Sequence, residues 1–217
     1  PSKHPDLTPD NDYEILLDNV FAKGAEISME MNPGTVTEEK LAAYKKAGIN
    51  RLSIGLQSVH DEELKMLGRI HTYEEFLHSY KMAREAGFEN INIDLISAIP
   101  GQTVESWAES LRKIIALKPE HISAYSLIIE EGTPFYEKYG DGAGASLLPS
   151  EDDEREMYWK TKQILKDFLC GHHGLVIESH DDCSFYVFLA ISPFLSLHYS
   201  RPLSRGSKYP WLPCQIL

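Results

Sequence analysis

Residues 50–99 read NRLSIGLQSVHDEELKMLGRIHTYEEFLHSYKMAREAGFENINIDLISAI, and this stretch decides the fold. NRLSIGL (Asn50 to Leu56) and INIDLISAI (Ile91 to Ile99) both read as strands. The segments between them, around Leu64 to Leu67 and Phe76 to Ala86, place apolar residues at helical spacing. Strands connected through helices run parallel, so the stretch predicts a parallel sheet covered by helices.

The same alternation continues on both sides of this unit. EISMEMN (Glu26 to Asn32) alternates like a strand, and after Ile99 a helix carries Trp107, Leu111 and Ile114 on one face. The remaining expected features are an N-cap signal at Thr8 and Pro9, capping boxes at Thr35 with Glu38 and at Thr72 with Glu75, a strand HISAYSLII (His121 to Ile129), a Gly-rich loop (Glu130 to Pro149) and an acidic helix from Ser150 to about Lys166. The fold class is therefore α/β, and periodicity leaves barrel and open sheet undecided.

Composition excludes several classes of protein. The chain has 217 residues, 42% of them hydrophobic, which is enough for one sizeable core. A net charge of -12 argues against binding to nucleic acid or to an anionic membrane surface. No run approaches the roughly 20 apolar residues that cross a bilayer, and no basic start precedes an apolar run. We therefore expect a cytoplasmic protein without a membrane span.

The cysteines and histidines near the end of the sequence do not predict a metal site. The three cysteines are far apart, which also argues against a disulfide framework. The residues concerned are Cys170, Cys183, Cys214, His172, His173 and His180. Their spacing matches no common ligand pattern, so we expect no metal ligands among them.

Polar residues late in apolar strands are the candidates for ligand binding, because ligands of parallel βα folds gather beyond the strands' carboxyl ends. Glu30, Gln57 and Asp94 occupy such positions, and Arg69 follows a helix that leads to the same rim. A structural role for Glu30 and Gln57 is about as frequent at such positions as a role in ligand binding. An arginine such as Arg69, taken alone, is most often a solvated surface charge. Asp94 is the sharpest candidate, because a carboxylate flanked by apolar strand residues needs a partner to offset desolvation. His71, Glu130 and Glu131 are expected to be structural, and MNPGT and AIPGQT to be strand-to-helix turns.

Four segments in order closely resemble one known family: EISMEMNPGTVT, AGINRLSIGLQSVHDEELKMLGRIHT, AGFENINIDLISAIPGQT and HISAYSLIIEEGTPF. They resemble the radical-SAM oxygen-independent coproporphyrinogen III oxidases and their heme-chaperone relatives, called HemW-type. The resemblance covers about 1–166. NPGT after Glu30 and the SLIIEEGTPF segment favour the chaperone branch. Ser97 and Ala98 replace the Tyr-Gly that is usual before LPGQT in relatives.

The resemblance implies an S-adenosylmethionine site lined by Glu30, Gln57, Arg69 and Asp94. For the complete parent protein it implies heme binding and delivery to a heme-accepting protein, with S-adenosylmethionine and a [4Fe-4S] cluster as cofactors. The alternative activity is that of a coproporphyrinogen III dehydrogenase. A third alternative is a non-catalytic fragment or a gene-model artefact, which a soluble, cooperatively melting monomer would argue against.

The sequence also departs from the family at both ends. The family's CxxxCxxC cluster motif is absent, and Pro1 and Ser2 resemble the end of the GGGTPS segment that follows it. We therefore expect an incomplete (β/α) TIM-like barrel that lacks its first strands and catalyses no radical chemistry as given. We expect the partial barrel to span 1–166 and a divergent tail, frameshifted or disordered, to span 167–217. An uninterrupted reading frame in the coding DNA would contradict a frameshift.

Overall fold

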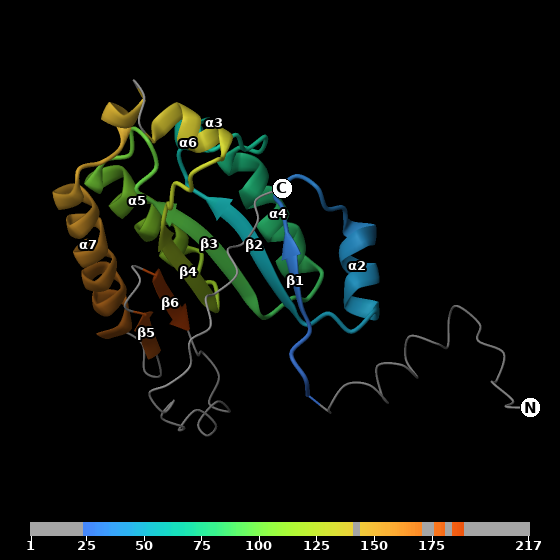
Figure 1. The fold of residues 1–217 in the computed structure, drawn as a ribbon. Helices are drawn as coiled ribbons and strands as arrows, with labels where there is room; N and C mark the ends of the chain where they lie inside the picture. The colour runs from blue at the N-terminus through green and yellow to red at the C-terminus, as the bar shows by residue number, and fades with distance from the viewer. Residues whose placement is uncertain (1–23, 141–143, 171–175, 181–183, 189–217) are drawn as a thin grey trace, which may run out of the picture.

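The computed structural model describes residues 24–140, 144–170, 176–180 and 184–188 (Figure 1). The expected helix after Thr8 lies outside these ranges. The elements are β1 (Ser28–Met31), α2 (Glu38–Lys46), β2 (Arg51–Gln57), α3 (Asp61–Met66), α4 (Tyr73–Glu85), β3 (Ile91–Ser97), α5 (Val104–Ala116), β4 (His121–Ser126), α6 (Pro134–Tyr139), η1 (Ala145–Leu147), α7 (Glu151–Cys170), β5 (Val176–His180) and β6 (Ser184–Phe188).

The strands form one sheet in the order β1-β2-β3-β4-β6-β5. Neighbouring strands from β1 to β4 run parallel, and each is connected to the next through at least one helix. This arrangement confirms the predicted α/β fold with a parallel sheet. The strands β5 and β6 instead pair antiparallel, with β6 alongside β4.

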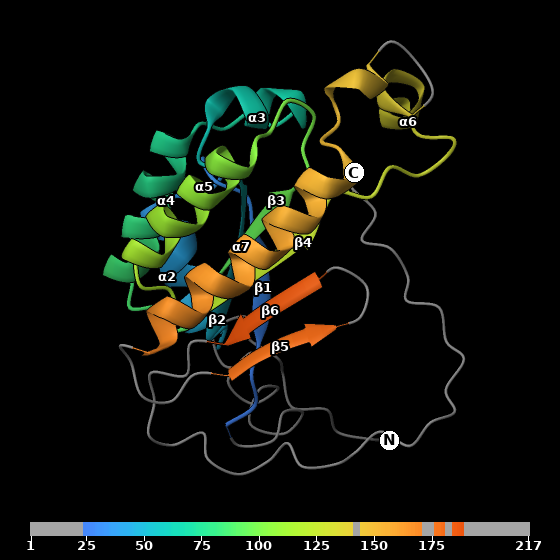
Figure 2. The same ribbon diagram turned by 90° about the vertical axis from the view of Figure 1, so that its left-hand side faces the viewer.

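Helices α2, α4, α5 and α7 lie together on one side of the sheet (Figure 2). Strand side chains such as Ile54, Ile93 and Ile122 face these helices and are almost completely buried. Trp107 and Leu111 of α5 pack into the same core, as their helical spacing predicted. One face of the sheet is thus apolar and covered by helices, which leaves the opposite face to carry the polar strand residues.

The helix caps agree with the sequence in one case and differ in another. Thr72 and Glu75 form the predicted capping box of α4, since each side chain bonds the other's backbone amide. The N-cap of α2 is Thr37 rather than Thr35. The Thr35 hydroxyl donates instead to the carbonyl oxygen of Asn32 at 2.7 Å. The hydroxyl of Thr35 is therefore used within the Pro-Gly turn, and the helix starts two residues later than predicted.

The region between β4 and α7 is more regular than a Gly-rich loop. It contains α6, which begins after the N-cap Thr133 with Pro134 in its first turn, and the short helix η1. The Thr-Pro pair signals the start of a helix, but the glycines around it favoured the prediction of a loop. The strands are also shorter than predicted, since β3 ends at Ser97 and β4 at Ser126.

The helix α7 begins after Ser150, as predicted, and continues to Cys170, beyond the expected boundary at residue 166. The described part of 167–217 consists of the end of α7 and the hairpin of β5 and β6. The expected division at this point stays a prediction. His172, His173 and Cys183 lie outside the described residues, as do the side chains of Cys170 and His180.

The turn that connects β3 to α5 contains Ala98, one of the two residues that differ from the relatives, in a left-handed conformation. Ala98 adopts a φ of 60°, the left-handed conformation that the usual glycine adopts easily. Its methyl group is buried, which offsets part of this strain. Pro100 and Gly101 then form a type II turn closed by the Gln102 amide on the Ile99 carbonyl at 2.9 Å.

We expect Gly101→Ala to lower the free energy of unfolding by about 1 kcal/mol, because Gly101 has a φ of 81°. An added Cβ would meet no atom within 4 Å, so the effect comes from the backbone alone. Gly101→Asn should lose less, since Asn tolerates this conformation. Urea denaturation measures both, and equal losses in the two variants would contradict the backbone explanation.

Candidate cofactor-binding site

The sheet face opposite the helices carries a row of polar side chains, here called the polar sheet face: Glu30, Ser53, Asn92, Asp94 and Ser123. Parallel pairing places Glu30 beside Ser53 and Ser53 beside Asn92. It also places Asp94 beside Ser123. Residues paired in this way point to the same face, so four neighbouring strands present hydrogen-bonding groups to one space.

Asp94 is the centre of this row. Ser53 Oγ donates to Asp94 Oδ2 at 2.9 Å, and Asn92 Nδ2 donates to Asp94 Oδ1 at 2.8 Å. Burial raises the pKa of Asp94, the hydrogen bonds from Ser53, Asn92 and Ser123 oppose the rise, and the charge of Glu30 adds to it. Glu30 itself is exposed. The structure therefore places the carboxylates of Glu30 and Asp94 close enough to repel each other, and a cationic ligand group would relieve this repulsion.

Gln57 is held at the end of β2 by an unusual backbone. It has a φ of 74° and follows an irregularity in the pairing with β3. Its amide folds over Gly55, where an added Cβ would lie 2.9 Å from Gln57 Nε2. The Tyr125 hydroxyl donates to Gln57 Oε1 at 3.3 Å. Because that oxygen already accepts this bond, Gln57 is better placed to donate hydrogen bonds to a ligand through its amide N–H groups.

Arg69 lies in the connection between α3 and α4. His71 fixes this connection at the carboxyl end of β2, since its Nε2 contacts the Leu56 carbonyl oxygen at 3.2 Å. This buried contact gives His71 a structural role, and burial is the main cause that lowers its pKa. Within the described part of the chain, no hydrogen bond or ion pair joins the Arg69 side chain to Glu30, Gln57 or Asp94. The connection nevertheless places Arg69 near the carboxyl end of β2, the end of the sheet at which Gln57 lies.

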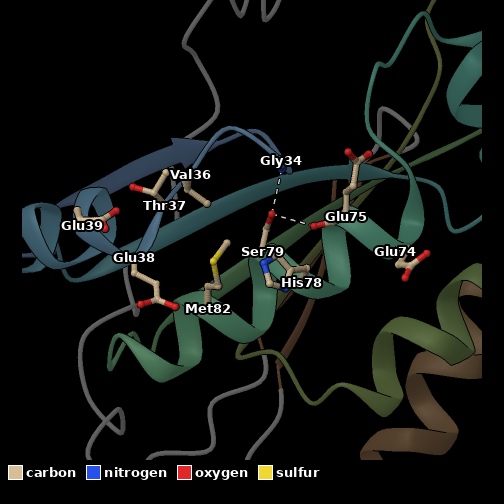
Figure 3. A pocket seen from close by; sticks show the side chains of 10 residues that line it. All are labelled: Gly34, Val36, Thr37, Glu38, Glu39, Glu74, Glu75, His78, Ser79 and Met82. Atoms are coloured by element: carbon tan, nitrogen blue, oxygen red, sulfur yellow. Dashed lines mark hydrogen bonds between the residues drawn. The ribbon is translucent and has the colours of Figure 1, made fainter.

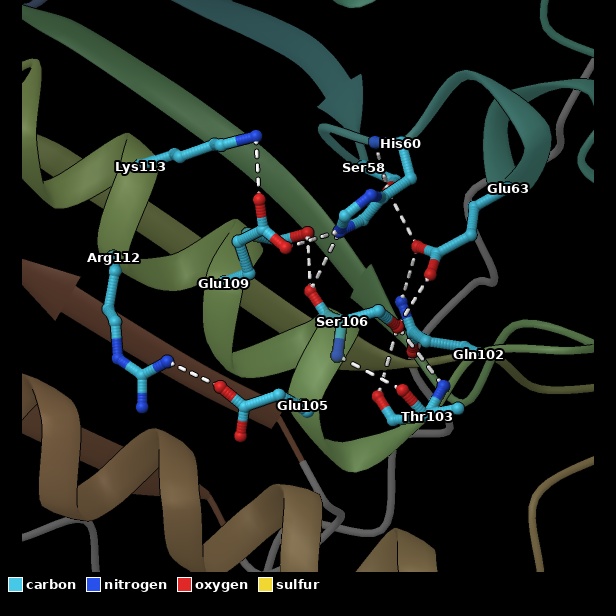
Figure 4. Close-up of polar contacts among 11 residues, drawn as sticks. Ser58, His60, Glu63, Gln102, Thr103, Glu105, Ser106, Glu109, Arg112 and Lys113 are labelled. Atoms are coloured by element: carbon cyan, nitrogen blue, oxygen red, sulfur yellow. Dashed lines mark hydrogen bonds and ion pairs between the residues drawn. The ribbon is translucent and has the colours of Figure 1, made fainter.

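A buried carboxylate that the sequence did not reveal stabilises the strand ends. Figure 4 shows Glu63 of α3 facing Ser58, Gln102 and Ser106. Ser58 Oγ and Gln102 Nε2 donate to Glu63 Oε2 at 2.6 and 2.8 Å, and Ser106 Oγ donates to Glu63 Oε1 at 2.7 Å. These bonds tie the segment after β2 to the turn after β3, and thereby fix the rim on which Gln57 and Arg69 lie.

Two hollows lie on the helical side of the protein instead of on the polar sheet face. The larger, of about 770 Å³, lies between the start of α2 and α4 and is lined by Glu38, Glu39, Glu74 and Glu75 among others (Figure 3). The second, of about 570 Å³, lies beside α3 and the start of α5. Neither is lined by any of the four predicted ligand residues, whereas ligands of parallel βα folds bind at the carboxyl ends of the strands.

No group of three or more histidine, cysteine or acidic side chains in the described ranges is arranged to hold a metal ion. None of the described helices combines the length and the apolar character that a membrane span requires. Glu130 and Glu131, expected to be structural, are both exposed in the loop after β4.

His121 on β4 makes the stability of the fold depend on pH. Burial and the nearby Arg51 lower its pKa from 6.5 to about 4. The unfolded chain binds this proton below pH 6.5 and the folded chain does not, so stability falls as the pH drops from 6.5 toward 4. We expect His121→Gln to remove this loss, about 2 kcal/mol after allowing for partial exposure. Urea denaturation of both proteins at pH 4.5 and 7.5 tests this, and parallel pH dependences would contradict it.

The comparisons with known proteins agree with this arrangement of strands. The sequence model of the Radical SAM superfamily matches residues 2–114. The heme chaperone HemW of Bacillus subtilis is 42% identical over 134 residues, which are 62% of this chain and 35% of that protein. HemW of Escherichia coli is 39% identical over 166 residues, 74% of this chain and 42% of that protein. The chain thus spans about two fifths of these relatives or less.

Among solved structures, the coproporphyrinogen III oxidase HemN of Escherichia coli, described as a radical SAM enzyme, superposes with a TM-score of 0.67 at 27% identity. The match covers 83% of this chain and 39% of HemN. The archaeal Elp3 of Methanocaldococcus infernus, at 22% identity and a TM-score of 0.57, shares the fold. The chain therefore belongs to the radical SAM superfamily, and within it the chain is similar to HemW-type heme chaperones and to a coproporphyrinogen III oxidase.

Proposed function

We propose that the polar sheet face and its rim bind S-adenosylmethionine. The proposed ligand residues are Glu30, Gln57, Asp94 and Arg69. The observation that carries this proposal is the hydrogen-bonded row around Asp94 on the sheet face opposite the helices, where the charge of the exposed Glu30 also acts on Asp94. Gln57 adds a polar side chain at the carboxyl end of β2, the end at which ligands of such folds bind.

The residues present fit the functional groups of this ligand. Its ammonium and sulfonium charges suit a site that holds two carboxylates, and its ribose hydroxyls suit carboxylate and amide acceptors. Arg69 offers a planar pair of donors to its carboxylate. The space over Gly55 admits the Gln57 amide only because position 55 lacks a side chain. In this superfamily, S-adenosylmethionine supplies radical chemistry once an iron–sulfur cluster provides an electron.

The residues of this sequence do not fit the cluster. Its three cysteines, Cys170, Cys183 and Cys214, do not occur in a CxxxCxxC spacing. We therefore propose that the 217 residues bind S-adenosylmethionine without catalysing radical formation.

For the biological role, we propose heme binding and transfer to an acceptor protein. The support is the identity of 39 to 44% with proteins named heme chaperone HemW. The alternative is a coproporphyrinogen III dehydrogenase, which the structural likeness to HemN favours. We also propose a cytoplasmic location, no nucleic-acid partner and a division into a partial barrel (1–166) and a separate tail.

Equilibrium dialysis of the purified chain against radiolabelled S-adenosylmethionine tests the binding proposal. The expected result is saturable binding of one molecule per chain that S-adenosylhomocysteine reduces by competition. Absence of saturable binding would contradict it. Titration with hemin, followed by the Soret band, tests the chaperone role. Saturable hemin binding supports it, whereas binding of coproporphyrinogen III without hemin binding would favour the oxidase alternative.

A further inference from the structure

Asn92 is the most connected side chain of the polar sheet face. It lies two residues before Asp94 on β3, on the same face, and is only 2% exposed. Its Nδ2 donates to Ser53 Oγ at 2.9 Å and to Asp94 Oδ1 at 2.8 Å, while its Oδ1 accepts from Ser123 Oγ at 3.0 Å. The side chain therefore connects β2, β3 and β4 and touches the carboxylate directly.

The directions of these hydrogen bonds are mutually dependent. Both N–H groups of the Asn92 amide are used, one toward Ser53 and one toward Asp94. The Ser53 hydroxyl then donates its proton to Asp94 Oδ2. If the amide were turned over, its carbonyl oxygen would face the carboxylate and repel it. The acceptor-only carboxylate of Asp94 thus fixes the orientation of the amide, and the Ser123 hydroxyl donates to the amide carbonyl oxygen on the other side.

The result is a carboxylate with both oxygens fixed by donors that belong to the sheet. An aspartate has two side-chain torsions, and Asp94 would be free to turn toward water or away from Glu30 without these bonds. A carboxylate held in one orientation binds a cationic or hydroxyl group at a lower cost in entropy.

We propose that Asn92 is a positioning residue for S-adenosylmethionine, which holds the Asp94 carboxylate in the orientation that receives the ligand. This inference rests on the proposed function of the polar sheet face. Asn92 acts through Asp94 and contacts the ligand through no atom of its own, because its donors and acceptor are already engaged within the sheet.

The test compares Asn92→Ala with Ile93→Val in the full chain. Ile93 is the next residue on β3 but faces the helices, so its shortening disturbs the same strand without touching Asp94. The first readout is an NMR titration of the ¹³C-labelled Asp94 carboxyl group, and the second is the dissociation constant for S-adenosylmethionine. For Asn92→Ala we expect the titration midpoint to rise by about one pH unit and the affinity to fall about tenfold. Ile93→Val should change neither.

The outcomes separate this inference from the proposed function. An unchanged Asp94 midpoint in Asn92→Ala would overturn the positioning role, and so would a shifted midpoint with unchanged affinity. If the unchanged chain binds no S-adenosylmethionine, the proposed function fails, while the titration still decides whether Asn92 orients Asp94. If Asn92→Ala does not fold, Asn92→Ser takes its place, because the shorter hydroxyl side chain cannot donate to Ser53 and Asp94 together, and the same two shifts are expected in smaller size.

Discussion

Replacing Glu30 by Gln and Arg69 by Met in one variant is expected to weaken S-adenosylmethionine binding on the order of a thousand-fold. Each substitution removes one charge from a proposed contact with the ligand, and a hydrogen bond to a charged group contributes about 2 kcal/mol. Two such losses amount to about 4 kcal/mol, or about three factors of ten in the dissociation constant. Isothermal titration calorimetry of the full chain measures the change.

The matched control for this variant is Glu85→Gln with Lys81→Met on α4. These two residues form an exposed ion pair at 3.7 Å, with 74% and 62% of the Lys81 and Glu85 side chains accessible. The control removes the same two charges and leaves the net charge unchanged, as the test variant does. Its affinity should stay within about twofold, since exposed pairs contribute little. Equal losses in both variants would show that the effect is not local to the strand ends.

Trp107→Ala is expected to lower the free energy of unfolding by about 4 kcal/mol. The Trp107 side chain is 1% exposed between α5 and α7, and its Nε1 donates to Thr161 Oγ1 of α7 at 2.8 Å. Truncating a buried tryptophan removes its packing and leaves a cavity, which costs about 3 to 5 kcal/mol. Urea denaturation followed by circular dichroism measures this loss, which is a large part of the stability of a typical domain.

Trp159→Ala on α7 is the control, because the same truncation there removes a ring that is 59% exposed. Lys162 lies over that ring at 5.2 Å, a contact that contributes about 1 kcal/mol or less at an exposed site. A small loss for Trp159→Ala beside a large one for Trp107→Ala would show that α7 is an integral part of the core. Similar losses would contradict the described packing of α7 on α5.

The sequence predicted the parallel part of the fold because its signals are local. The strand 91–97 alternates apolar residues with Asn92 and Asp94, and the faces of α4 and α5 repeat at helical spacing. The signals failed where two local motifs compete for one residue. Thr35 fits a capping box with Glu38, yet the preceding turn offers the Asn32 carbonyl to its hydroxyl, and Thr37 becomes the cap.

The candidate site was predictable only as far as single strands reveal it. Asp94 is predictable because a carboxylate between apolar strand residues is unusual, and the alternation of Asn92 and Asp94 also indicates that both lie on one face of the strand. The partners Ser53 and Ser123 come from other strands, and pairing register decides such contacts. The role of Glu63 could not be predicted for the same reason, since its partner Gln102 is 39 residues away in the sequence.

The most direct test of the account is to map S-adenosylmethionine onto the protein by NMR, following backbone amides of the ¹⁵N-labelled chain during a titration. If S-adenosylmethionine binds as proposed, the shifted signals cluster on the polar sheet face and its rim, around residues 30–32, 55–58, 69–71 and 92–98. Shifts confined to the acidic hollow between α2 and α4, around His78 and Met82, would contradict it, as would a spectrum that the ligand leaves unchanged.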